Sequence, residues 1–155
     1  MRYPNYFGRV SLFIIYFWFG ILKVIGISPA EGLVQNLFSE TLGSLVDFQI
    51  FSLGFGLFEC FVGLIWLFPR LTKPAFYILI AHMVMTFLPT LLLPEATWQT
   101  WFTPTLVGQY IIKNFALISL GWFIWKAESK EVKETTTKKI SQHTRLEKVM
   151  VKKVS

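Results

Sequence analysis

Four long apolar runs in this chain each contain one ionisable residue, and these residues could carry out chemistry. They are Lys23, Glu59, His82 and Lys113. A charged side chain near the centre of a bilayer-spanning helix costs about 2.5–3.5 kcal/mol on insertion scales. Such a residue is retained where it has a partner, a water-filled cavity or a ligand. The sequence therefore predicts a membrane protein with a buried polar site.

The four apolar runs have the length of membrane-spanning helices. They cover residues 10–27, 50–68, 74–93 and 106–125. Each is close to the roughly 20 residues that a hydrocarbon core about 30 Å thick requires. Because backbone groups in lipid must be hydrogen-bonded within their own segment, each run is expected to be a helix. The expected fold is an all-α membrane protein, a four-transmembrane-helix bundle in residues 1–126 followed by a basic cytoplasmic tail in residues 127–155.

The charges of the connecting segments predict how the spans are oriented. The N-terminus has two arginines, the loop between the second and third runs has Arg70 and Lys73, and the C-terminal tail is rich in lysine. Residues 28–49 and 94–105 contain neither Lys nor Arg. Because short cytoplasmic loops carry an excess of Lys and Arg, both termini are expected to be cytoplasmic.

Three of the buried ionisable residues are predicted to lie at similar depth. From the outer ends of their spans, Lys23 lies about 6 Å deep, Lys113 about 10 Å and Glu59 about 14 Å, at roughly 1.5 Å of rise per residue. Glu59 also shares a helix face with a serine and two glycines, where a neighbouring helix can approach closely. The three residues are therefore expected to meet inside the outer half of the bundle.

Two interpretations of this constellation are open. In the first, Glu59 pairs with Lys23 or Lys113 and fixes the helix register, and Lys23, if unpaired, reaches the outer surface or Glu31. In the second, the surplus cation faces a pocket for an anionic or carbonyl-bearing ligand, such as a quinone. Further residues that could line this pocket are Tyr16, Gln109, Tyr110 and Asn114.

His82 is expected to form hydrogen bonds inside the bundle, with a proton-relay or quinone-carbonyl role as the alternative. A haem held by two histidines is improbable, because the other histidine, His143, lies in the polar tail. Cys60 is the single cysteine, which excludes an intramolecular disulfide and CxxC chemistry, and it is expected to pack as a small apolar side chain. The chain contains no metal-ligand spacing, phosphate loop or dinucleotide fingerprint.

The segments outside the four runs also carry patterns. Between residues 33 and 46, apolar residues recur at spacings of three or four, which predicts a short amphipathic helix in the first outer loop, with an ordered loop as the alternative. The tail of residues 127–155 has eight Lys or Arg and four Glu. A basic segment beside a membrane helix indicates contact with anionic lipid rather than with nucleic acid, and the tail could be disordered or lie on the membrane surface.

Four stretches of the chain resemble the DoxX-like superfamily of small four-helix membrane proteins, and most closely its YkgB/RclC-type branch. They are FGILKVIGISPAEG, GLFECFVGLIWL, LPEATWQTWFTPT and GQYIIKNFALI, within residues 9–126. The resemblance implies an inner-membrane bundle, linked to oxidative stress and to quinone-dependent redox complexes. It also implies roles for Lys23, Glu31, Glu59, Lys113 and Asn114. The basic tail departs from this pattern, and the cysteines of the similar vitamin K reductase-type enzymes are missing.

Three functions remain open from the sequence. The first is a redox-linked membrane subunit that binds a quinone or a similar molecule and works with a redox partner protein. The second is a non-catalytic membrane protein that assembles or protects a partner. The third is a small transporter, which four short helices could form only as a homo-oligomer, because the broken-helix pairs of transporters are missing.

Overall fold

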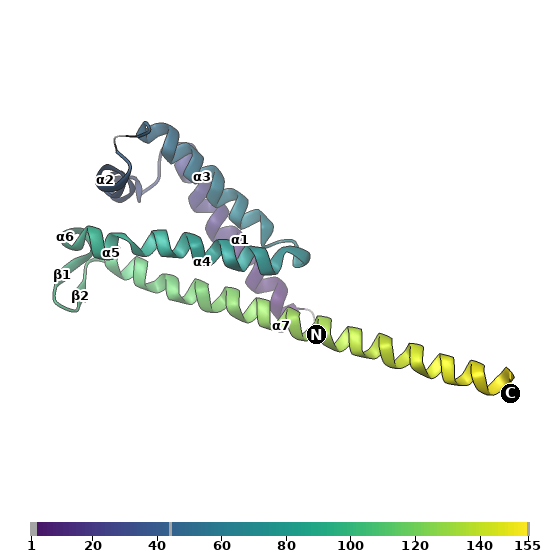
Figure 1. The fold of residues 1–155 in the computed structure, drawn as a ribbon. Coiled ribbons are helices and arrows are strands. Elements are labelled where there is room, and N and C mark those ends of the chain that lie inside the picture. Colours follow the sequence, from purple (N-terminus) through teal and green to yellow (C-terminus); the bar gives the residue numbers. More distant parts are fainter. Residues whose placement is uncertain (1–2, 44, 155) are drawn as a thin grey trace.

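The structure is a computed structural model that describes residues 3–43 and 45–154. Figure 1 shows an almost entirely helical chain in which two helix pairs cross. One pair is α1 (Tyr3–Val24) with α3 (Phe48–Ile65), and the other is α4 (Thr72–Phe87) with α7 (Leu106–Val154). Helix α1 also packs on α7, and α3 on α4, so that the four helices form one assembly.

Within the described residues, four helical stretches are long and apolar enough to cross a membrane. They are Tyr6–Val24, Phe48–Trp66, Pro69–Leu92 and Leu106–Gln142. The third stretch combines the 3-10 helix η1 (Pro69–Leu71), α4 and the short helix α5 (Pro89–Leu92). This confirms the prediction of a helical protein with four helices suited to a multi-pass membrane protein.

The connections between the helices are grouped at two ends of the assembly. The start of α1, η1 and the point where α7 leaves the other helices lie at one end, which we call the basic end because it carries Arg9, Arg70 and Lys73. The segments 25–47 and 88–105 lie at the other end, which we call the acidic end. The structure thus places together the segments that the charge pattern assigns to one side.

Helices α1 and α3 are in backbone contact through glycines. A Cβ atom built on Gly20 would lie 2.7 Å from the backbone oxygen of Gly56 and 2.7 Å from the backbone nitrogen of Cys60. A Cβ atom on Gly56 would in turn lie 2.8 Å from the oxygen of Gly20. The small-residue face of α3 therefore does what the sequence predicts: it lets a neighbouring helix approach closely.

The apolar core lies where the two helix pairs cross. Its fully buried members include Leu12 of α1, Val62 and Trp66 at the end of α3, and Leu79 of α4, and α7 adds Ile124. Most other large apolar side chains are exposed, as expected for helices whose outer faces contact lipid.

Local signals in the sequence explain several helix ends. Helix α1 ends at Val24, and the chain turns away at Gly26, whose φ of 71° favours glycine; the N–H of Ile27 there bonds to the carbonyl of Leu22 at 3.0 Å. Helix α3 begins at Phe48 and is capped by Asp47, whose side chain accepts hydrogen bonds from the backbone N–H groups of Gln49 and Ile50.

The acidic end contains one expected and one unexpected element. Helix α2 (Glu31–Thr41) confirms the predicted short helix in the first of these connections. The second connection folds into α6 (Pro94–Thr97) and a hairpin of β1 (Trp98–Thr100) with β2 (Thr103–Pro104), antiparallel to each other. The alternation that marks a strand cannot be read from two or three residues, so the sequence did not predict this hairpin.

The sequence analysis expected the fourth helical span to end at residue 125, but α7 is longer. It continues to Val154 and projects beyond the other helices, away from the acidic end (Figure 1). The composition of this segment allows the helix to continue, since it has neither Gly nor Pro after Gly121 and is rich in Lys and Glu, both good helix formers. The interpretation of the tail as disordered is thereby replaced by a continuous helix.

Candidate functional site

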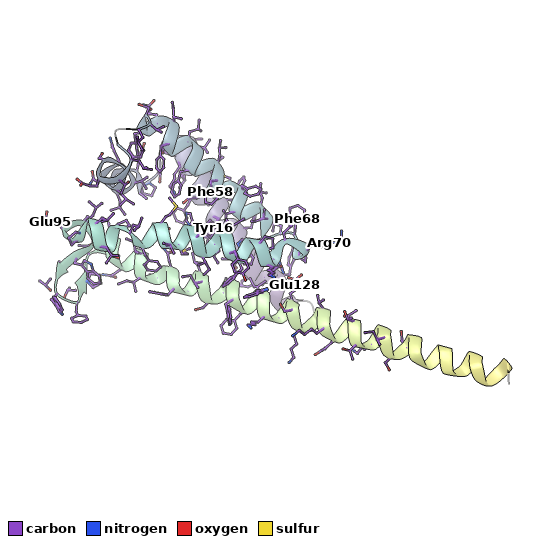
Figure 2. The ribbon with its side chains drawn as sticks, in the orientation of Figure 1. Tyr16, Phe58, Phe68, Arg70, Glu95 and Glu128 are labelled. Carbon is purple, nitrogen blue, oxygen red and sulfur yellow. The ribbon has the colours of Figure 1, made fainter. Side chains whose placement is uncertain are left out.

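The candidate site is formed by facing residues of α1, α3 and α4. Tyr16 and Lys23 are two turns apart on one face of α1, and this face packs on the Glu59 face of α3. Helix α4 adds His82 from the other helix pair. Figure 2 shows Tyr16 and Phe58 between the α1–α3 pair and α4.

Four buried side chains form a continuous hydrogen-bonded network. Lys23 Nζ donates to Glu59 Oε2 at 2.5 Å, and Glu59 Oε1 lies 3.3 Å from His82 Nε2. His82 Nδ1 lies 3.2 Å from the hydroxyl of Tyr16. The side chains of Lys23 and Glu59 are only 6% and 8% exposed. We call Tyr16, His82, Glu59 and Lys23 the relay network.

The donors and acceptors of the relay network follow from its chemistry. An ionised carboxylate only accepts hydrogen bonds, so His82 must donate from Nε2 to Glu59. Nδ1 of a neutral His82 is then an acceptor, and the Tyr16 hydroxyl donates to it. The hydroxyl of Thr86 donates to the backbone carbonyl of His82 at 3.0 Å. The Lys23 ammonium and the Glu59 carboxylate neutralise each other, so the network carries no net charge.

Aromatic rings enclose the relay network on the α3 side. The ring of Phe55 stacks on the His82 imidazole, with 5.5 Å between centroids and 22° between planes. Lys23 Nζ lies 5.4 Å from the centroid of the same Phe55 ring. Phe58 is a second neighbour of His82, at 6.0 Å between centroids. These rings lower the local dielectric and strengthen the Lys23–Glu59 pair.

The structure corrects the expected convergence of Lys113 with Glu59. Lys113 is exposed, and its Nζ lies 5.2 Å from the ring centroid of Tyr110 on the same helix. It lies on α7, which packs on α4 and α1, whereas Glu59 lies on α3. Lys23 is therefore the lysine that pairs with Glu59, and Lys113 adds no surplus positive charge beside it.

The other predicted site residues fall into two groups. Tyr16 and His82 belong to the relay network. The sequence analysis expected hydrogen bonds for His82 inside the bundle but did not place it beside Glu59 and Tyr16. Gln109 and Tyr110 are exposed and Asn114 half-buried on α7, in the same region as Lys113. Glu31 is half-buried in the first turn of α2, and within the described part of the chain it lies outside the relay network.

A second buried polar cluster at the basic end was missed. The guanidinium of Arg9 donates to the backbone carbonyl of Trp66 at 3.0 Å, to the Thr72 hydroxyl at 2.5 Å and to the Glu128 carboxylate at 2.5 Å. These contacts join α1, the end of α3, α4 and α7. The signal that could have revealed the cluster is the acidic Glu128, which follows the last apolar run directly in an otherwise lysine-rich segment.

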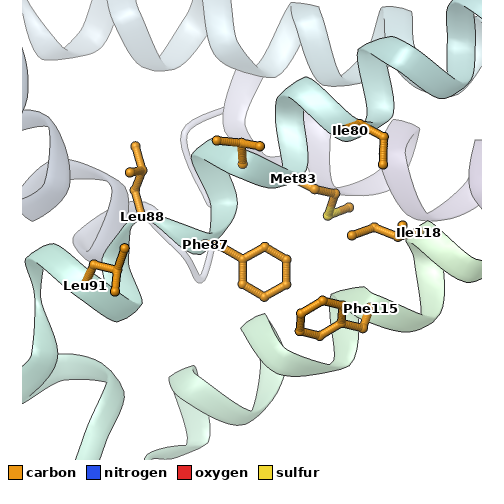
Figure 3. A pocket seen from close by; sticks show the side chains of 8 residues that line it. Ile80, Met83, Phe87, Leu88, Leu91, Phe115 and Ile118 are labelled. Carbon is orange, nitrogen blue, oxygen red and sulfur yellow. The ribbon is translucent and has the colours of Figure 1, made fainter.

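A cavity of about 310 Å³ lies between α4 and α7 (Figure 3). Its lining is apolar and consists of Ile80, Met83, Val84, Phe87, Leu88, Leu91, Phe115 and Ile118. Because a ligand needs polar groups to fix its orientation, this cavity suits a hydrocarbon chain rather than a reacting group. Among the described residues, no group of three His, Cys, Asp or Glu side chains could hold a metal ion.

Comparison of the chain with family models, with curated proteins and with solved structures finds no match. The resemblance to DoxX-like proteins therefore stays a prediction from short motifs. The function proposed below is therefore based on the geometry of the relay network.

Proposed function

We propose that this protein is a multi-pass inner-membrane protein whose relay network exchanges a proton with a quinone-like small molecule. The observation that carries the proposal is the continuous chain from the Tyr16 hydroxyl through His82 to the Glu59 carboxylate. A buried ionisable group in a membrane span is costly, and three such groups in hydrogen-bonded sequence are typical of proton pathways.

The orientation of the hydrogen bonds defines the direction of proton transfer. A ligand hydroxyl beside Tyr16 gives its proton to the Tyr16 oxygen, while the Tyr16 proton moves to His82 Nδ1. The proton on His82 Nε2 then moves to Glu59, and Lys23 stabilises the carboxylate before the transfer. In the reverse direction, the network returns a proton to a carbonyl oxygen. A quinol becomes a quinone by losing two protons and two electrons; one proton follows this path to Glu59, and the other leaves to water.

Oxidation of a quinol also releases two electrons, which need an acceptor. We therefore propose a redox partner protein, in line with the oxidative-stress complexes that the DoxX-like resemblance implies. The proposed quinone is a substrate or cofactor that the bundle binds from the lipid bilayer.

The charge distribution supports a cytoplasmic location of the basic end. Arg9, Arg70 and Lys73 lie at this end together with the extension of α7, whereas the connections at the acidic end contain Glu and Asp but neither Lys nor Arg. By the positive-inside rule, both termini are then cytoplasmic. The relay network begins nearer the acidic end at Lys23, which is one residue from the end of α1.

Equilibrium binding of a decyl-substituted benzoquinone to the protein in lipid nanodiscs tests this proposal. Quinones quench tryptophan fluorescence, so saturable quenching reports binding. Tyr16→Phe and His82→Phe should each weaken binding by roughly three- to tenfold, the value of one hydrogen bond. Lys113→Met is the matched control and should bind as the wild type does. Unsaturable quenching that is identical in all four proteins would rule out a specific site.

A second function has one observation in its favour. Every polar group of the relay network already has a partner within the protein. A network closed in this way has a purely structural role in the second function: it holds α1, α3 and α4 in register. The protein would then assemble a partner through the projecting part of α7. The same binding experiment separates the two functions, because a purely structural network has no affinity for the quinone.

A further inference from the structure

A row of aromatic rings connects α2 to the relay network. Phe38 of α2 lies 4.8 Å from Phe51 of α3, measured between ring centroids. Phe51 is nearly parallel to Phe55, with 5.7 Å between centroids and 9° between planes, and Phe55 stacks on His82. We call Phe38, Phe51 and Phe55 the aromatic row. It leads from the acidic end of the assembly to the imidazole that the proposed function uses.

Helix α2 covers the outer end of this row. Phe38 is its buried residue, and the helix contacts both α3 and α5, so it bridges the two helix pairs where they diverge (Figure 1). Its N-cap, Ala30, makes no side-chain capping bond. The chain reaches α2 through Gly26, around which a Cβ atom would meet nothing within 4 Å. Among the described residues, the hydrogen bonds of α2 stay within the helix and its neighbour Ser28, so a shift of α2 as a unit breaks only apolar packing such as that of Phe38 on Phe51.

The apolar cavity between α4 and α7 does not provide the same access. Its residues Ile80 and Val84 lie two positions before and after His82, and thus roughly 200° away around α4. The cavity opens on the face of α4 that is opposite to the relay network. A ring entering there would meet the backbone of α4 before it met His82.

We propose that α2 is a movable cover, and that a flat conjugated ring reaches His82 by stacking along the aromatic row. This inference rests on the proposed function and specifies its ligand class and its route. A flat ring with a carbonyl or hydroxyl group can stack on Phe55 beside His82, with His82 kept in place, while its oxygen approaches Tyr16. A saturated molecule of the same size lacks the face that stacks on these rings. The hydrocarbon tail of the ligand stays in the lipid.

Reversible cross-linking of α2 tests the route. In a Cys60→Ala background, Phe38→Cys and Phe51→Cys are joined by a short bis-methanethiosulfonate reagent, which a reductant cleaves. Phe87→Cys with Phe115→Cys is the matched control across the apolar cavity, because those two rings are also 4.8 Å apart between centroids. Stopped-flow tryptophan quenching by decyl benzoquinone measures association before reduction, and again after reduction and removal of the reductant.

The cross-link between α2 and α3 should slow association by about tenfold or more, as expected when a cover over a site cannot open, and reduction should restore the rate. The control cross-link should leave the rate unchanged. If the wild type binds the probe and the α2 cross-link has no effect, or if the control slows binding instead, the route is wrong while the proposed function stands. If the wild type itself shows no saturable binding, the proposed function fails.

Loss of the two rings could itself abolish binding in the reduced α2 pair. Phe38→Ala then decides, because it opens the outer end of the row and keeps Phe51 and Phe55. We expect association and dissociation both to become faster in this variant, with little change in affinity. Rates equal to those of the wild type would contradict a cover at Phe38.

Discussion

At the scale of single residues, Glu59 is the residue on which the site depends. Its two carboxylate oxygens bond to different helices, one to Lys23 of α1 and the other to His82 of α4. It is buried together with both partners, so its removal would strand a buried lysine charge. The sequence predicted a lysine partner for Glu59, because a lone carboxylate in an apolar run must have a partner, and the structure places Lys23 there.

Glu59→Ala should therefore destabilise the fold strongly. Breaking a buried pair by removing one partner costs about 3–5 kcal/mol, because the remaining charge is left uncompensated. Thermal unfolding in detergent measures the effect. Glu40→Ala is the matched control, since Glu40 is exposed on α2. Equal unfolding temperatures for the two variants would show that the Lys23–Glu59 pair does not hold the helices together.

The assignment of Lys113 shows where reasoning from the sequence ends. Counting residues from a span boundary estimates the depth of a side chain, and this count predicts depths for Lys113 and Glu59 that differ by about 4 Å. It does not give the neighbours of a helix. Because α7 packs on α4 and α1 while α3 packs mainly on α1, similar depth did not bring Lys113 to Glu59.

At the scale of elements, the position of the site depends on the backbone contact between α1 and α3. Lys23 and Gly20 lie one turn apart on α1, as do Glu59 and Gly56 on α3, so the glycine contact holds the lysine at hydrogen-bonding distance from the carboxylate. The glycine spacing and the period of α2 could be read from the sequence. The extension of α7 could not, because high helix propensity alone does not keep a polar segment helical in water.

Gly20→Ala should separate α1 from α3. The added Cβ atom would lie 2.7 Å from two backbone atoms of α3, which cannot move aside as a side chain can. Overpacking of this kind costs about 1–3 kcal/mol, and it should weaken benzoquinone binding as well. Gly54→Ala is the control on α3, since a Cβ atom there would meet nothing within 4 Å. Equal unfolding temperatures for the two alanine variants would contradict a close backbone contact between α1 and α3 at Gly20.

At the scale of the whole molecule, the two ends of the assembly differ in charge, and this difference predicts the orientation in the membrane. Cysteine labelling in intact cells with a membrane-impermeant maleimide tests it in a Cys60→Ala background. Gln99→Cys at the acidic end should react, whereas Lys73→Cys at the basic end should react only after the cells are permeabilised. Both side chains are exposed in the structure, so accessibility is decided by the membrane alone. The reverse labelling pattern would invert the proposed topology.

The structure also guides the choice of labelling positions. Thr97 and Thr72 lie in connecting segments and look accessible in the sequence, but both are buried. Thr97 is packed below the β1–β2 hairpin and donates to the carbonyl of Leu93, and Thr72 accepts from Arg9. The sequence gives the side of the membrane for a loop, whereas the exposure of a residue within that loop depends on tertiary contacts.

The central claim is that Glu59 receives the proton that a bound quinol releases. Electrochemically induced infrared difference spectroscopy of the protein with decyl benzoquinone tests this most directly. Oxidation of the bound quinol should produce the carbonyl stretch of a protonated carboxylic acid. That band should disappear in Glu59→Gln and persist in Glu95→Gln, an exposed glutamate at the acidic end. A spectrum without a carboxylic acid band, or a band that survives in Glu59→Gln, would contradict the proton transfer and leave the relay network a structural connection between helices.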